Sequence, residues 1–238
     1  HLRKMLLLDG CVQSAIAPNI NSATARVLDR LKVQAILAPQ AGCCGAVRLH
    51  LQDKTGAIAA AKRNIDAWWP LLSPQTPAGV ESIVMTSTGC GVMVKDYGYL
   101  LAHDPDYAEK AKQISAKTQD LSETLPEFTQ ALSEQIGGKI HQRLVWHSPC
   151  TLQHGQKITG KVETLLRALG IDLQTCADSH LCCGSAGTYS LLQADLAKQL
   201  RDNKIQTLEK LGNEKIKHVN KAGEKTATKR KRRKKAYY

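Results

Sequence analysis

The chain has 238 residues, 42% of them hydrophobic, and carries a formal net charge of +12 at pH 7. This length allows one large or two ordinary domains with hydrophobic cores, and no run of 18 or more apolar residues predicts a membrane-spanning helix. No secretory signal peptide is visible either, so we expect a cytoplasmic protein.

The basic charge is concentrated at the C-terminal end. From Lys217 onward there are ten Lys or Arg and one acidic residue, Glu224, so this tail contributes +9 and residues 1–216 carry only +3. Such a run can act as a localisation signal or bind polyanions. We favour a solvated, disordered tail over residues 217–238, and we expect no nucleic-acid partner.

The first half of the chain alternates strand and helix signals. Short apolar runs predict strands at residues 4–9, 33–38 and 82–86. Apolar residues at helical spacing predict helices at residues 23–31 and 55–69. Asn21 or Ser22 is the expected N-cap of the first helix, and Pro70 is expected to end the second.

The second half repeats this plan after a charged helical stretch. That stretch covers residues 105–135 and is broken by Gly137-Gly138. Strands are then predicted at residues 144–146 and 171–175, and helices at residues 161–169 and 191–211. At that point the first half would supply a third strand, and no such strand is predicted here. The alternation therefore indicates an α/β fold whose second unit is incomplete.

A vicinal cysteine pair followed by glycine occurs twice, and each pair is preceded by another cysteine. The matching positions are Cys11, Cys43 and Cys44 in the first half and Cys150, Cys182 and Cys183 in the second, all related by an offset of 139. One offset shared by three of only eight cysteines indicates an internal duplication. Cys90 completes the first set, whereas its counterpart in the second half is missing. The cysteines follow predicted strands, where open α/β sheets place their sites.

Three or four thiolates at one point typically hold zinc or an iron–sulfur cluster. Gly45 and Gly184 allow left-handed backbone and close approach of an inorganic ligand. The spacing differs from the paired Cys-x-x-Cys of zinc ribbons and from the ferredoxin run. A disulfide framework is the alternative, and it is less favoured because a 26 kDa chain without secretory features has little need of disulfides.

Other candidate residues are weaker. Cys176 has Leu37 as its counterpart, so we interpret it as a small core residue. His147, His154 and His180 lie near the second set of cysteines and could ligate or tune a centre, but isolated histidines are more often structural. Trp68-Trp69 is interpreted as half-buried packing. No Ser-His-Asp order or phosphate-binding loop is present, so we predict no catalytic residue.

Several short sequence motifs around the cysteines carry a resemblance to a known family. They are DGCVQ at residues 9–13, NIDAWWP at 64–70, STGCG at 87–91, HSPCTLQH at 147–154, DSHLCCGSAGTY at 178–189 and QLRDNK at 199–204. Together with the cysteine pattern, these motifs resemble those of the cysteine-rich CCG-domain family, which occurs in heterodisulfide reductase and in iron–sulfur subunits of flavin-linked hydroxy-acid dehydrogenases. The resemblance covers nearly all of residues 1–216 and is strongest to glycolate-oxidising subunits.

The resemblance implies two duplicated, Rossmann-like, three-layer units with mostly parallel strands, the second of them truncated. The expected divisions are a first cysteine-rich domain, a helical connection, an incomplete second domain and a basic tail, at residues 1–104, 105–139, 140–216 and 217–238. We also expect a C-terminal piece of a longer subunit, because the family's two ferredoxin-type motifs have no match here. The basic end is atypical of the family.

The resemblance also implies an electron-transfer role without substrate chemistry. The expected cofactor is an iron–sulfur cluster of 4Fe-4S type, held by the metal ligands Cys11, Cys43, Cys44 and Cys90. Cys150, Cys182 and Cys183 would form a degraded second cofactor site, with zinc as an alternative occupant of one site.

The expected partners are FAD-containing glycolate oxidase subunits and, indirectly, a membrane quinone or cytochrome acceptor. Such a complex would lie peripherally at the inner face of the membrane. Two alternatives remain open: a non-redox, zinc-stabilised protein-binding module, and the equivalent subunit of a lactate-utilisation complex.

Overall fold

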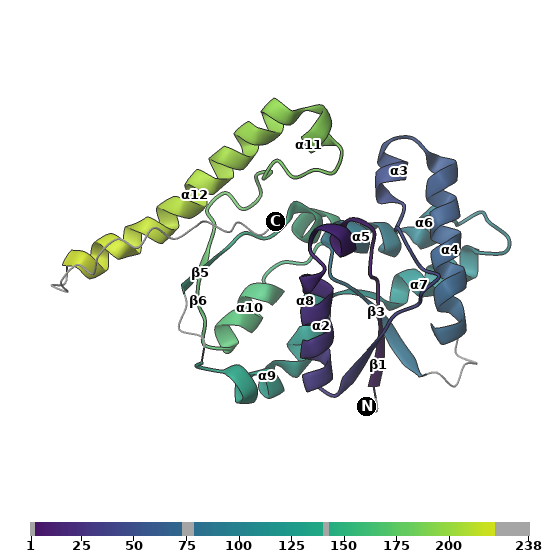
Figure 1. Cartoon of the computed structure of the whole chain (residues 1–238), viewed down its shortest axis with the longest axis horizontal. Helices are drawn as coiled ribbons and strands as arrows, with labels where there is room; N and C mark the ends of the chain where they lie inside the picture. The colour runs from purple at the N-terminus through teal and green to yellow at the C-terminus, as the bar shows by residue number, and fades with distance from the viewer. Residues whose placement is uncertain (1–2, 73–78, 140–142, 222–238) are drawn as a thin grey trace.

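A parallel sheet forms the centre of the first unit in this computed structural model, which describes residues 3–72, 79–139 and 143–221, with side chains up to Leu211 (Figure 1). Its four strands follow the order β2-β1-β3-β4. They are β1 (Arg3–Leu7), β2 (Val33–Ile36), β3 (Val80–Met85) and β4 (Thr118–Asp120). All pairings are parallel, so the carboxyl ends of the strands meet at one edge.

Alternate strand residues face two hydrophobic layers, as a pleated strand requires. On β1 and just beyond it, Leu6 and Leu8 join one buried cluster, whereas Met5 and Leu7 join the other. The first cluster is covered by α4 (Lys54–Leu72), α5 (Thr88–Lys95), α6 (Tyr97–Leu100) and α7 (Ala108–Lys117). The second is covered by α2 (Asn19–Arg30), α8 (Leu121–Thr124), η1 (Leu125–Phe128) and α9 (Thr129–Ile136). The predicted three-layer α/β class is confirmed.

The second unit is smaller and packs on the first. Its described strands, β5 (Arg143–Trp146) and β6 (Asp172–Thr175), form a parallel pair. Its helices are η2 (Thr151–Gly155), α10 (Lys161–Ala168), α11 (Tyr189–Leu192) and α12 (Ala194–Lys221). Leu165 and Leu169, on and just after α10, belong to the same buried cluster as Leu28 of α2. The two units therefore share one hydrophobic core, and Figure 1 shows α10 lying between β6 and α2.

Three helix predictions need correction. Helix α4 continues through Pro70 to Leu72, because a proline in the last turn removes only one helical hydrogen bond. The helix expected at 191–211 is two helices, since Gln193 leaves the helical region; the second passes Gly212 and ends at Lys221. Asn21 lies inside α2, whose N-cap is Pro18.

The stretch expected to be wholly helical contains a strand. β4 joins β3 over only three residues, Thr118 to Asp120, too few for an alternating pattern to be recognised. Short helices directly after the cysteine-bearing turns were also missed, namely α1 (Val12–Ile16) and α3 (Ala46–His50). Residues 73–78, 140–142 and 222–238 lie outside the described residues. The disorder predicted for the tail therefore stays a prediction from residue 222 onward, whereas residues 217–221 are helical, as the end of α12. Among the described helices, none is long and apolar enough to cross a membrane.

Candidate metal centre

The four cysteines of the first unit form two neighbouring thiol pairs. The loops after β1 and β2 and the first turn of α5 bring them to the carboxyl edge of the sheet. The Cys11 thiol donates to Cys43 Sγ at 3.4 Å, and the Cys44 thiol donates to Cys90 Sγ at 3.3 Å. The predicted grouping of these residues therefore has a structural basis.

Glycine is required at the turn that carries the vicinal pair. Gly45 has φ of +91°, and its N–H donates to Cys43 Sγ at 3.4 Å. A Cβ at Gly45 would lie 3.1 Å from the Ala57 carbonyl oxygen of α4. The turn is thus left-handed and pressed against a helix, and both conditions favour glycine.

A buried amide and a buried phenol hold the backbone of this turn. Asn64, 0% exposed, accepts from the Gly42 N–H at 2.8 Å and donates to the Cys43 carbonyl at 3.1 Å. Its amide also donates to the Tyr97 hydroxyl, which donates in turn to the Cys44 carbonyl at 2.8 Å. Three consecutive residues of the turn are therefore fixed by side chains that are themselves buried.

A second polar network ties the Cys11 loop to the end of β3. Asn21 donates to the carbonyl and the carboxylate of Asp9, at 3.0 and 2.9 Å. Its amide oxygen accepts from Gln13 and from the Thr86 hydroxyl, each at 2.7 Å, and Gln13 also contacts that hydroxyl directly. This network positions the loop that presents Cys11.

The helix that carries Cys90 is also held by the second unit. Gln156, just after η2, donates to the Thr88 carbonyl and to Asp120, both at 3.1 Å. The hydroxyls of Thr88 and Thr151 are hydrogen-bonded. Thr151 directly follows Cys150, so the two cysteine-bearing segments are joined through α5 and η2.

The hydrogen bonds between the thiols give these cysteines different pKa values. Hydrogen bonding from Cys44, helped by Ser87, lowers the pKa of Cys90 to about 7. The same hydrogen bond, together with burial, raises the pKa of Cys44 far above its ordinary value. Burial raises the pKa of Cys11 and that of Tyr97. In the metal-free site, Cys90 is therefore the thiol whose ionisation near neutral pH its hydrogen bonds favour.

This division predicts the order of thiol reactivity. In the metal-free protein, alkylation of Cys90 by iodoacetamide should rise with pH to a midpoint near 7, because the thiolate forms as pH passes its pKa. Cys44→Ala removes the donor and should move that midpoint upward. Peptide mass spectrometry after timed alkylation measures both. A Cys90 midpoint near the ordinary thiol value of about 8.5 in the unaltered chain would contradict the assignment.

The donor set fits a soft metal centre, although it does not surround one point. Zinc bound tetrahedrally at about 2.3 Å from each sulfur would hold neighbouring sulfurs about 3.8 Å apart, close to the spacing within each pair. In the described parts of the chain, however, no three His, Cys, Asp or Glu side chains surround one metal position. The two pairs are near enough for Cys90 to influence Cys11 electrostatically, and Cys43 to influence Cys44. Four soft thiols in two adjacent pairs are suited to a centre with several metal atoms.

The second set of cysteines is less assembled. Among the described residues, no sulfur–sulfur hydrogen bond joins Cys150, Cys182 and Cys183, which are all partly exposed. Gly184 repeats the local turn: its φ is +82°, its N–H donates to Cys182 Sγ at 3.3 Å, and a Cβ would clash with the Ala197 carbonyl. The counterpart of Cys90 would fall at residue 229, outside the described residues.

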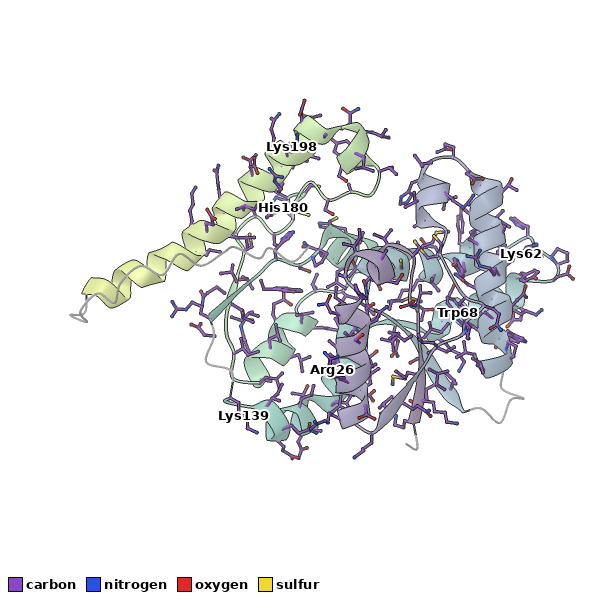
Figure 2. All side chains as sticks on the ribbon, in the orientation of Figure 1. Arg26, Lys62, Trp68, Lys139, His180 and Lys198 are labelled. Carbon is purple, nitrogen blue, oxygen red and sulfur yellow. The ribbon has the colours of Figure 1, made fainter. Side chains whose placement is uncertain are left out.

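The remaining candidates divide by burial. Cys176 is buried and donates to the Ala177 carbonyl at 2.9 Å. His154 and His180 are exposed. His147 is half-buried, and its Nδ1 is buried without a hydrogen-bond partner. Trp68 is wholly buried on α4 (Figure 2), more deeply than the half-buried packing we predicted for the pair, whereas Trp69 is half-buried.

Sequence reasoning missed the side chains that hold the turn. Asn64 interrupts an otherwise apolar helix face formed by Ala57, Ala60, Ala61 and Trp68, and a lone polar residue on such a face was the available signal. Tyr97 offered none, because a tyrosine after a short helix is common in any core.

The fold and the thiol arrangement define a duplicated, cysteine-rich α/β protein with one assembled thiol site. The chain belongs to the cysteine-rich domain (CCG) family, whose model matches residues 5–95 and 144–222.

Named relatives share most of this chain. It is 50% identical over 209 residues to the glycolate oxidase iron-sulfur subunit of Escherichia coli (strain K12), covering 88% of this chain and 50% of that protein. It is 27% identical to lactate utilization protein A of Geobacillus thermodenitrificans, covering 87% and 83%. It is 24% identical to a probable glycolate oxidase iron-sulfur subunit of Bacillus subtilis, covering 85% and 44%. The chain therefore spans about half the length of the glycolate oxidase subunits.

Proposed function

We propose that this chain is an electron-transfer component of a flavin-linked 2-hydroxy-acid dehydrogenase, with an iron–sulfur cluster at the first unit. The observation that carries the proposal is the gathering of Cys11, Cys43, Cys44 and Cys90 into two adjacent thiol pairs. The 50% identity to a glycolate oxidase iron-sulfur subunit supports iron over zinc.

The four cysteines would hold the cluster, which when bound supplies reversible one-electron transfer. We propose the 4Fe-4S type, because several metal atoms can accept thiolates from two pairs that do not converge on one point. Binding would replace the thiol protons, so uptake of the cluster should release protons. Zinc at this site remains the non-redox alternative.

The chain's own residues would orient the ligands and limit access of water. The N–H of Gly45 already points at Cys43 Sγ, and hydrogen bonds to sulfur tune the potential of such centres. Asn64 and Tyr97 fix the turn by hydrogen bonds to its backbone carbonyls. The Cys44 side chain is only 3% exposed, so little water reaches it. A site fixed in this way changes shape little between oxidation states.

The substrate and partners are inferred from the relatives. We propose glycolate as the substrate of the whole complex, an FAD-containing subunit as electron donor, and a membrane quinone or cytochrome as the eventual acceptor. The complex would lie in the cytoplasm, at the inner face of the membrane. Lactate is the second candidate, because this chain covers 83% of a lactate utilization protein but only half of the glycolate oxidase subunit.

Anaerobic purification tests the cofactor assignment. We expect brown protein with broad visible absorption, stoichiometric iron and sulfide, and bleaching by dithionite. Colourless protein that holds only zinc would remove the redox role and leave a metal-stabilised binding module.

A further inference from the structure

The two thiol pairs of the first unit differ in their access to solvent. The outer pair is Cys11 and Cys43, whose sulfurs lie 3.4 Å apart; Cys11 is exposed and Cys43 is half-buried. The inner pair is Cys44 and Cys90, whose sulfurs lie 3.3 Å apart, and Cys44 is only 3% exposed. A bulky oxidant therefore reaches the outer pair, at Cys11, before it reaches the inner pair.

The Cys-Cys-Gly turn directs the two adjacent thiols to different partners. Asn64 and Tyr97 hold the carbonyls of Cys43 and Cys44, so the backbone of both residues is fixed. In this conformation Cys43 contacts Cys11, whereas Cys44 contacts Cys90. Four cysteines can be joined in pairs in three ways, and the turn favours the one that joins Cys11 to Cys43.

The loop that presents Cys11 is held in place as well. The Ser14 hydroxyl contacts the carbonyls of Gly10 and Cys11, at 2.9 and 3.3 Å, and Asn21 donates to Asp9. Because both loops are fixed, the Cys43 thiol is already beside the Cys11 sulfur. An exchange reaction that begins at Cys11 can therefore be completed within the molecule, which makes its second step fast.

The second unit provides an internal comparison. Cys150, Cys182 and Cys183 are all half-buried, and no sulfur–sulfur hydrogen bond joins them in the described parts of the chain. A thiol of this set that reacts with an external disulfide has no thiol placed beside it to complete the exchange. The reaction there should stop at the mixed disulfide.

We propose that Cys11 and Cys43 form a reversible disulfide by exchange with a low-molecular-weight disulfide such as glutathione disulfide, and that this bond excludes metal from the first unit. The Cys11 thiolate attacks one sulfur of glutathione disulfide, which forms a mixed disulfide and releases one glutathione. The Cys43 thiolate then attacks the Cys11 sulfur, which forms the protein disulfide and releases the second glutathione. Two protein thiols are oxidised, and one glutathione disulfide is reduced to two thiols.

This inference rests on the proposed metal-binding function, because the new bond removes two of the four proposed ligands. The inner pair stays reduced, since Cys44 is buried. Excess glutathione thiol reverses the exchange and restores the full ligand set. The outer pair would thus let the metal-free site close under oxidising conditions and reopen under reducing ones.

Peptide mass spectrometry of the metal-free full chain tests the pairing. After treatment with glutathione disulfide at about pH 8.5, near the ordinary thiol pKa, we expect a link between Cys11 and Cys43, with Cys44 and Cys90 still reduced. Cys43→Ser should trap glutathione on Cys11, because the second attacking thiolate is missing. Cys44→Ser changes the adjacent thiol and should leave the Cys11–Cys43 link unaffected.

Cadmium tests the exclusion of metal. Cd²⁺ is a soft ion that binds thiolates, whereas Mg²⁺ is a hard ion that prefers oxygen ligands. Saturation of the unaltered chain with Cd²⁺ should slow formation of the Cys11–Cys43 link about tenfold or more, since a thiolate bound to metal is a poor nucleophile. The same concentration of Mg²⁺ should not change the rate.

Three results in the unaltered chain would overturn the inference: a dominant link between other cysteines, a Cys11 thiol that stays reduced or keeps its glutathione, or an equal rate with and without Cd²⁺. Because the unaltered chain decides all three, a variant that fails to fold cannot hide the answer. Iron in the anaerobic preparation is a separate measurement. Its absence would remove the proposed redox function and leave the disulfide pairing unaffected.

Discussion

Replacing Cys90 with serine is expected to reduce the iron bound by the first unit from stoichiometric to near zero. Cys90 is the thiol that the second unit lacks, and in the metal-free site its sulfur accepts from Cys44, which lowers its pKa. A serine hydroxyl is a much harder donor than a thiolate and is poorly suited to a soft iron–sulfur centre. The substitution therefore leaves three thiols, as in the second unit.

The measurement is iron content and visible absorption after anaerobic reconstitution. Cys176→Ser is the matched control, because it makes the same chemical change at a buried thiol whose hydrogen bond goes to a backbone carbonyl. The control should keep its iron. Circular dichroism should show that both variants fold, since Cys90 lies in the first turn of α5, where serine is well tolerated. Retained iron in Cys90→Ser, or loss only in the control, would contradict the ligand assignment.

The sheet could be anticipated from the sequence because its central strands are apolar and end in recognisable turns. The C-terminal parts of β1 and β3, residues 5–7 and 83–85, have both faces buried and therefore read as continuous apolar runs. β4 could not be anticipated, because Thr118 to Asp120 is held by pairing with β3 and carries no pattern of its own. The position of the cysteines at the carboxyl edge of the sheet could be predicted from the parallel topology, since ligands bind where parallel strands end.

The supporting residues of the site were harder to find, since their roles depend on contacts between distant segments. Asn21 is of a residue type favoured at helix N-caps, yet it lies inside α2, where its side chain is hydrogen-bonded to Asp9 and Thr86. Lys204 belongs to the QLRDNK motif that resembles the family, but its burial depends on how α12 packs on the loop before Cys182. Sequence spacing locates ligands, whereas tertiary packing decides which polar residues hold them.

The largest stability effect is expected at Asn64. Asn64→Asp keeps an acceptor for the Gly42 N–H but removes the donors to the Cys43 carbonyl and the Tyr97 hydroxyl. Each buried group left without its partner costs about 1–3 kcal/mol, and a buried carboxylate adds to that cost. A loss of about 3 kcal/mol corresponds to a fall of about 6–12 °C in melting temperature.

The sequence offers a matched control for this change. The offset of 139 pairs Asn64 with Asn203, which is exposed on α12, so Asn203→Asp should change stability by less than about 0.5 kcal/mol. Because the new carboxylate at position 64 would repel thiolates, Asn64→Asp should also weaken iron retention about tenfold or more, an effect typical of residues that orient ligands. Calorimetry of the metal-free chain and iron release to a chelator measure the two effects. Equal melting temperatures for the two variants would show that the Cys-Cys turn keeps its shape without Asn64, and that the sulfur positions are set by the strands alone.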